Sequence, residues 1–460
     1  MKRLFRIVSI VLFVTFIGIP VSVHADVAPP GHPPGSNPEP GSESTQVRMV
    51  AETVVLDVQA STPQGSLGQA KVTADFTMHN MRSESESMGV RFPLASNNGF
   101  GEISEIKNVS IKVNGSPVVT RRIIQADPTW GSDLVPWAEF DVTFPPGQDV
   151  NIQVIYLLEG TGEYPFISFD YIFHTGAGWR DSIGSADLIV RLPYEASAQN
   201  VILDDQIGWS QTTSGGTFQG QEIRWHFDNF EPDQNNDFQV SLVMPSAWQK
   251  VLKERANVGV NSNDGEAWGR LGKLYKEMFF YRQGFRHDAG GQELYALSVA
   301  AYEKAVTLLP NDALWHAGFA HLLEFHSYFA SMEGQDVRDE VLRSMQEIHT
   351  ALEISPDDPK VKEIAETIYY SFPDAIQQLE SGYDFLWLTA TPVLSTPTIA
   401  PVEPTSTPPV ATPLPITETA VPEKDATPVP TSTPVTATNP LCGSAFLVPL
   451  GLVWLMRRKR

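Results

Sequence analysis

The chain contains one cysteine, Cys442, among its 460 residues. A single cysteine excludes an internal disulfide framework and any zinc site built from several thiolates. Positive charge is also scarce, since 32 Lys and Arg stand against 54 Asp and Glu, for a formal net charge of −22. Nucleic acids are bound by basic surfaces, so the composition excludes nucleic acid as an expected partner.

The N-terminal residues 1–25 carry the pattern of an export signal. Lys2, Arg3 and Arg6 precede an apolar run over residues 7–23, and the small residue Ala25 stands just before Asp26. This order is typical of a secretory signal peptide cleaved after Ala25. The alternative is a retained signal anchor, because the apolar run approaches the length of a membrane span. In both cases the sequence predicts export.

The C-terminal residues predict a short membrane or sorting segment. Residues 441–456 hold no charge in sixteen positions, and four cations follow over residues 457–460. A helix of this length measures about 24 Å, and its basic tail should stay in the cytoplasm. The order Asn439-Pro440-Leu441-Cys442-Gly443, apolar run and basic cluster resembles the tripartite C-terminal sorting signals of bacterial surface proteins. This resemblance implies processing or lipid attachment at Cys442, while the alternative is a plain stop-transfer helix.

Two segments are predicted to lack a packed core. Residues 389–440 contain thirteen Pro, fourteen Thr and no aromatic residue. Proline at this density favours extended polyproline II, so we expect a disordered stalk, a candidate for O-glycosylation, that lifts the folded part away from the membrane. Residues 26–46 are predicted to be a flexible lead.

Residues 47–245 are predicted to form an all-β sandwich, or two in tandem. Val72, Ala74, Phe76 and Met78 alternate with polar residues, as on a strand with one buried face. Asn114-Gly115 predicts a hairpin turn. About a dozen such strands with turns between them are typical of a sandwich. The segments 88–94, 173–181 and 225–232 resemble an exported bacterial β-sandwich domain of unknown function over residues 50–245, which implies no activity.

Three features of this β region are candidate sites. Trp179 follows a glycine-rich turn, and with Trp225 it could form a ligand platform, or its indole could cap the core. His174, Asp181 and His226 could meet as a metal or acid–base cluster, although nothing in the sequence fixes their distances. The acidic residues over 228–237 suggest weak calcium binding or a solvated loop, since Phe238 stands where an EF-hand loop needs glycine.

Residues 246–263 are predicted to be a linker, and residues 264–388 an α-helical module. The spacing of apolar and small residues there resembles the tetratricopeptide repeat, with Ser298 in place of the usual alanine. The positions that carry this resemblance are Trp268, Leu271, Gly272, Tyr275, Ser298, Tyr302, Ala305 and Pro310. The repeat spacing from Trp268 to Tyr302 is too long, so an insertion between the paired helices is expected around residues 279–291, and a similar one near residues 331–338.

A second repeat and a capping helix should follow. The pairs Ala305…Pro310 and Ala351…Pro356 have the same spacing, and residues 359–370 are amphipathic. The resemblance implies binding of a protein or peptide in a concave face, while a purely structural role against the sandwich is the alternative. His321 and His326 do not form a metalloprotease motif, because they lie about 140° apart on a helix.

The leading functional hypothesis is an exported surface protein, anchored to the membrane, that binds a protein or glycan partner. The sequence contains no Gly-x-Ser-x-Gly, phosphate-loop or dinucleotide-binding motif, so we expect neither enzyme activity nor a cofactor. Two alternatives stay open. An extracellular hydrolase acting on polysaccharide or peptide would need two carboxylates about 5–9 Å apart. A scaffold of an envelope complex would co-purify with membrane partners.

Overall fold

The structure is a computed structural model, and its described residues all lie in one compact unit. The described ranges are 39–40, 45–61, 63–95, 105–126, 133–203, 212–232, 237–282, 288–379 and 382–389. The signal peptide with Ala25, nearly all of the stalk, and the C-terminal segment with Cys442 lie outside these ranges and stay predictions. None of the described helices is both long enough and apolar enough to cross a membrane.

The strands form where the sequence alternates between apolar and polar residues. In β3 (Gln69–Asn80) every second side chain is buried, and the predicted burial of Val72, Ala74, Phe76 and Met78 is confirmed. The hairpin predicted at Asn114-Gly115 is also confirmed, because both residues have positive φ and join β5 (Ser110–Val113) to β6 (Ser116–Pro117).

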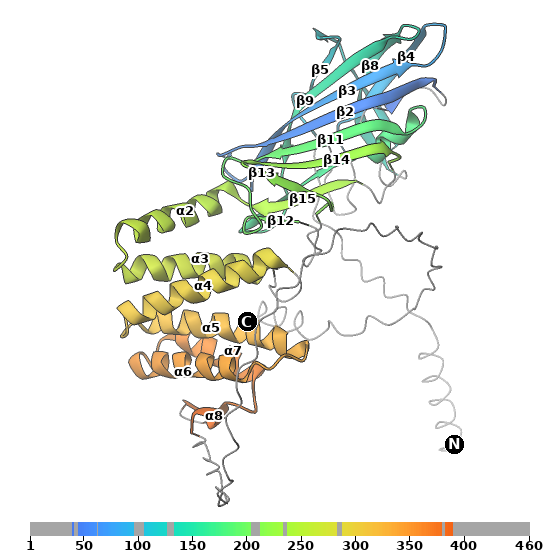
Figure 1. The fold of residues 1–460 in the computed structure, drawn as a ribbon. Coiled ribbons are helices and arrows are strands. Elements are labelled where there is room, and N and C mark those ends of the chain that lie inside the picture. Colours follow the sequence, from blue (N-terminus) through green and yellow to red (C-terminus); the bar gives the residue numbers. More distant parts are fainter. Residues whose placement is uncertain are drawn as a thin grey trace, which may run out of the picture. The chain divides into compact units, whose positions relative to one another are not determined.

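The largest sheet has eight strands in the order β13-β14-β11-β2-β3-β9-β5-β6 (Figure 1). Its other members are β13 (Thr217–Gln219), β14 (Glu222–Phe230), β11 (Ile183–Arg191), β2 (Val47–Val58) and β9 (Asp149–Glu159). β11 pairs with β2 in parallel, with Ala186 opposite Glu52, and the remaining pairs are antiparallel. The sheet is therefore mixed.

Two smaller sheets contribute to the same hydrophobic core. One has the order β1-β4-β8-β7, from β1 (Glu39–Pro40), β4 (Glu86–Pro93), β8 (Leu134–Phe144) and β7 (Arg121–Ala126). The other has the order β10-β15-β12, from β10 (Phe166–Tyr171), β15 (Phe238–Val243) and β12 (Val201–Ile202). Phe92 of β4 packs on Tyr156 of β9 at a centroid distance of 5.5 Å, so side chains of different sheets interlock.

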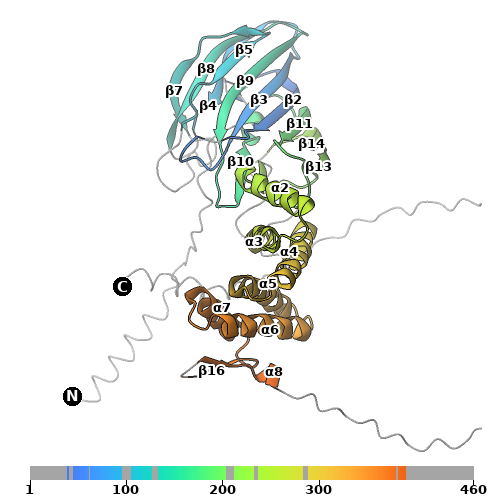
Figure 2. The ribbon, with the colours of Figure 1, turned by 90° about the vertical axis from the view of Figure 1, so that its left-hand side faces the viewer.

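Six helices follow the strands in the described chain, and each lies beside the next one in sequence (Figures 1 and 2). They are α2 (Pro245–Val260), α3 (Gly265–Arg282), α4 (Ala289–Leu308), α5 (Ala313–Met332), α6 (Arg338–Ile354) and α7 (Pro359–Ser371). The short hairpin β16 (Gln377–Leu379) and β17 (Gly382–Asp384) and the helix α8 (Leu386–Thr389) end the described chain. Asp312 and Asp358 cap α5 and α7, because each side chain accepts two backbone N–H groups of the first turn.

The fold class expected from the sequence, an all-β sandwich followed by a separate tetratricopeptide-like module, is wrong. The main sheet is mixed, and one hydrophobic cluster runs from the sheets into α2, α3, α4 and α5. Phe166 of β10, for example, stacks on Tyr281 of α3 at 4.5 Å. The predicted linker is also wrong for most of its length, because α2 occupies residues 245–260 and buries Trp248 and Val251. Helices and sheets thus make one α/β unit.

Candidate ligand-binding pocket

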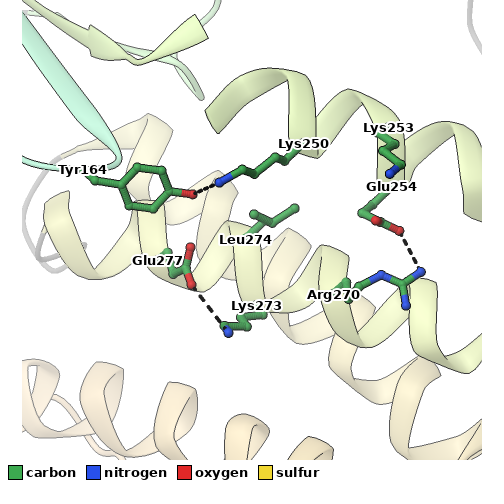
Figure 3. A pocket seen from close by; sticks show the side chains of 8 residues that line it. All are labelled: Tyr164, Lys250, Lys253, Glu254, Arg270, Lys273, Leu274 and Glu277. Carbon is green, nitrogen blue, oxygen red and sulfur yellow. Dashed lines mark hydrogen bonds and ion pairs between the residues drawn. The ribbon is translucent and has the colours of Figure 1, made fainter. Parts of the chain in front are cut away.

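A pocket of about 450 Å³ opens between α2, α3 and the loop before β10 (Figure 3). Its walls carry four cations, two carboxylates, one tyrosine and one leucine. The lining residues are Tyr164, Lys250, Lys253, Glu254, Arg270, Lys273, Leu274 and Glu277. This volume lies in the range of small-molecule sites, which is roughly 300–1,000 Å³.

The sequence of α2 and α3 places these cations side by side. Pro245 begins α2 at its first turn, where a missing N–H is tolerated. A four-residue turn leads into α3, whose Ala267 N–H donates to the Asp264 carboxylate at 3.0 Å. So short a turn makes the two helices antiparallel neighbours. Each helix buries its apolar face in the core and presents its charged residues, three or four positions apart, to the pocket.

Two of the cations are matched by carboxylates in the pocket. Arg270 Nη2 lies 3.1 Å from Glu254 Oε2, and Lys273 Nζ lies 4.0 Å from Glu277 Oε1 (Figure 3). Burial alone would raise the pKa of Glu254, but hydrogen bonds from Arg270 and Asn257 outweigh it and hold that pKa below its usual range. Glu254 is therefore ionised at neutral pH and neutralises Arg270.

The other two cations, Lys250 and Lys253, are not matched in this way. Lys250 Nζ donates to the Tyr164 hydroxyl at 3.2 Å and lies 4.8 Å from the centre of its ring. Both contacts are to a neutral side chain. Lys253 is exposed and makes no hydrogen bond or ion pair with any residue in the described part of the chain. Net positive charge thus gathers on α2, in a chain that is strongly acidic overall.

Tyr164 is held beside α2 by backbone hydrogen bonds on both sides of the loop. Thr161 and Ser168 exchange a pair of bonds, at 3.0 and 2.7 Å, which closes the loop. The Pro165 carbonyl accepts the N–H of Met244, the residue before α2, at 2.9 Å. Tyr164 is 41% exposed, and its ring forms an accessible aromatic wall of the pocket.

The predicted ligand platform at Trp179 and Trp225 does not fit the structure. Trp179 is 4% exposed and meets the edge of Phe144, while Trp225 is 2% exposed and packs on Phe238. The Trp225 Nε1–H donates to the Thr213 carbonyl at 2.8 Å. Both indoles lie in the core, which agrees with the alternative interpretation that the Trp179 indole caps the core.

The residues proposed as a metal or acid–base cluster lie apart from one another. His174 bonds Asp237, which also accepts the backbone N–H groups of Phe173 and His174. His226 lies between Asp187 and Asp228 on the exposed face of β11 and β14. No group of three or more His, Cys, Asp or Glu among the described residues is arranged to hold a metal ion. Residues 233–236 of the candidate calcium loop lie outside the described ranges.

The helical positions singled out in the sequence are packing residues of α3, α4 and α5. Ser298 Oγ donates to the Gly272 carbonyl at 2.8 Å, and Tyr302 packs over Gly272. Tyr275 Oη accepts from Arg255 at 2.7 Å. Leu271 and Ala305 are buried, Trp268 Nε1 donates to the Ser262 carbonyl, and the Pro310 carbonyl contacts His316. These contacts join neighbouring helices and leave the resemblance to the repeat family a prediction.

The histidines of α5 serve different neighbours. His321 meets the edge of Phe280 at 4.9 Å, and burial lowers its pKa to about 3. His326 Nδ1 lies 2.9 Å from Glu340 of α6. Glu324, between them in sequence, accepts a hydrogen bond from Ser371 of α7. These three side chains connect α5 to α3, α6 and α7.

The pocket was not predicted from the sequence, because Lys250, Lys253 and Glu254 fall in the segment expected to be a linker. A usable signal was present. Pro245 is a common first helical residue, and Ala247, Trp248, Val251 and Val258 fall on one face at helical spacing. The contribution of Tyr164 had no such signal, because it stands 86 residues before Lys250.

Comparisons with known proteins do not place the chain in a family. No protein-family model matches it, and no curated protein matches its sequence. A solved candidate nutrient binding protein from Legionella pneumophila is 19% identical with a TM-score of 0.41, over 61% of this chain and 99% of that protein. The M1 zinc metallopeptidase of Deinococcus radiodurans is 8% identical with a TM-score of 0.22, over 70% and 94%. A candidate protease from Parabacteroides distasonis is 9% identical with a TM-score of 0.21, over 75% and 63%. Scores this low support neither a fold family nor a function for this chain.

Proposed function

We propose that the protein is an exported, membrane-anchored binding protein, without catalytic activity, that holds an anionic ligand in the pocket between α2 and α3. The observation that carries this proposal is the excess of cations in that pocket, where four cations face two carboxylates in a chain of net charge −22. Export and anchoring rest on the sequence patterns of residues 1–25 and 439–460.

The ionised state of the pocket carboxylate Glu254 favours binding over hydrolysis. A carboxyl group that acts as a general acid needs a pKa raised toward neutrality. The pKa of Glu254 is instead lowered by Arg270 and Asn257, so this group has no proton to give at neutral pH. Arg270 and Glu254 therefore shape the pocket wall, and the lysines supply the attraction for an anion.

A titration of the full chain with polyanions tests the proposal. Polygalacturonate and dextran sulfate should bind, neutral dextran should not, and binding should weaken as salt rises, because exposed charges are screened within about 10 Å at 0.1 M salt. The variant Lys250→Glu/Lys253→Glu should abolish binding. Lys304→Glu is the matched control, since Lys304 is an exposed lysine of α4 outside the pocket. Equal binding of neutral and anionic polymers, or equal loss in the control, would refute the proposal.

A further inference from the structure

Two of the four pocket cations, Lys250 and Lys253, are available to attract an anionic ligand. Arg270 and Lys273 have carboxylate partners in the pocket. Among the described residues, Lys250 donates its one hydrogen bond to a tyrosine, and Lys253 lies close enough to lower the pKa of Glu254 but forms no hydrogen bond or ion pair. Lys250 and Lys253 are three residues apart on α2, so they lie about 4.5 Å apart along the helix axis, on neighbouring positions of one face. Lysine carries its ammonium group on a long, flexible stem, so two lysines on neighbouring positions of one helix face can both reach a single carboxylate or phosphate group.

The exposed Tyr164 ring stands next to Lys250, one lysine of this pair (Figure 3). Its hydroxyl oxygen accepts from Lys250, which leaves the phenolic O–H hydrogen able to donate to a ligand. The ring is fixed by the backbone bonds of its loop to the start of α2. An aromatic ring with a polar tip is suited to a ligand that is flat and apolar on one side and rich in hydroxyls at its edge.

Building on the proposed function, we infer that the ligand of this pocket is an anionic sugar, meaning a sugar ring that bears one carboxylate or phosphate. Lys250 and Lys253 hold the anionic group, and the Tyr164 ring and hydroxyl contact the sugar. The pocket volume of about 450 Å³ accommodates one or two sugar rings.

The architecture of the walls argues against an acidic peptide as the ligand. Strand addition needs free backbone N–H and C=O groups, and those of α2 and α3 are bonded within the helices. A helix in a groove needs a row of apolar anchors, but Leu274 is the one aliphatic residue among the eight that line the pocket. Recognition of acidic motifs relies on free arginines, and Arg270 is paired with Glu254. Recognition by side chains around a small pocket therefore favours a sugar.

Calorimetric titration of the full chain with four small probes tests this inference. Glucuronic acid and glucose 6-phosphate carry the sugar and the anion, glucose carries the sugar alone, and glutarate carries carboxylates without a sugar. Glucuronic acid and glucose 6-phosphate should each bind at least about tenfold more tightly than glucose or glutarate. The order of the first two probes distinguishes carboxylate from phosphate as the anionic group.

Three variants separate the two halves of the site. Lys250→Gln/Lys253→Gln should weaken binding of the tighter of the two anionic sugars by about tenfold or more, because charge-assisted hydrogen bonds are lost. Tyr164→Leu should weaken it by about threefold to tenfold, because the aromatic contact is lost. Lys304→Gln, outside the pocket, should bind like the wild type. Unchanged circular dichroism and melting temperature show that each variant is folded.

The possible failures are distinct. Suppose that glutarate or an acidic peptide such as tetraglutamate binds as tightly as glucuronic acid and glucose 6-phosphate, and that Tyr164→Leu has no effect. The sugar assignment is then wrong, while the proposed anion binding stands. If none of the anions binds and polyanions fail as well, both the inference and the proposed function are wrong. Saturation-transfer NMR supplies a second readout, since the sugar ring protons should receive magnetisation from the Tyr164 ring and should lose it in Tyr164→Leu.

Discussion

The ion pair between Arg282 and Asp288 should be one of the strongest determinants of stability where helices meet sheets. Arg282 ends α3, its side chain is 2% exposed, and its Nε donates to Asp288 Oδ2 at 2.6 Å. Asp288 precedes α4 and is 7% exposed on its side chain. Arg282 Nη1 also donates to the Ala198 carbonyl, between β11 and β12. One guanidinium thus connects two helices to the β region.

The substitution Arg282→Met should destabilise the protein by about 3–5 kcal/mol. Methionine keeps much of the volume but leaves the Asp288 carboxylate buried without its cation, and breaking a buried pair typically costs that much. Arg282→Met/Asp288→Asn should recover about 2 kcal/mol, because no ionised group is then left buried. Arg121→Met is the matched control. Arg121 also pairs with carboxylates, Glu139 and Asp141, but its side chain is 49% exposed, so its loss should change the unfolding free energy far less than the loss of Arg282.

Urea unfolding followed by tryptophan fluorescence gives these free energies, and hydrogen exchange shows where protection is lost. Because sheets and helices share one hydrophobic cluster, exchange should rise both in α4 and in the strands next to Ala198. A loss below about 1 kcal/mol, or a double variant no more stable than the single one, would refute the reasoning. A loss of protection confined to the helices would mean that the helices unfold separately from the sheets.

Local periodicity made much of the secondary structure predictable. The alternation of β3 and the amphipathic pattern of α7 depend on each residue's own burial, which the sequence records directly. A helix expected over residues 359–370 is observed at Pro359–Ser371, and its role as the cap of a repeat stack stays a prediction. The turn at Asn114-Gly115 was predictable because positive φ restricts the residue types.

Long-range pairing was not predictable in the same way. A strand buried on one face has the same alternation of apolar and polar residues whether its neighbour is parallel or antiparallel. The sequence of β11 therefore did not predict its parallel pairing with β2. The apolar faces of α2 and α3 could have packed on helices alone, and only the structure shows Tyr281 stacked on Phe166. The candidate pocket has the same origin, since Tyr164 and Lys250 are distant in sequence and become neighbours only through this shared core.

Three further predictions concern the helices. Gly272→Leu should cost about 1–3 kcal/mol or more in urea unfolding, because a Cβ there would already lie 3.0 Å from the Tyr302 ring. Gly290→Ala should cost at least about 2 kcal/mol, because the added Cβ would lie 1.9 Å from the Ala198 carbonyl oxygen, and a cost near zero would show that this junction is loosely packed. The last concerns Glu340, whose carboxylate lies among Tyr295, His326 and Ser327 and whose pKa burial raises to about 7. A folded-state pKa above the unfolded one stabilises the fold at low pH, and this contribution is lost as the pH rises through about 7. Glu340→Gln imitates the protonated acid and cannot titrate. Between pH 6 and pH 8 the wild type should therefore lose about 1 kcal/mol of unfolding free energy relative to Glu340→Gln. A difference between the two proteins that stays constant with pH would show that Glu340 does not titrate in this range, and hence that α4, α5 and α6 enclose its carboxylate less tightly than the hydrogen bonds indicate.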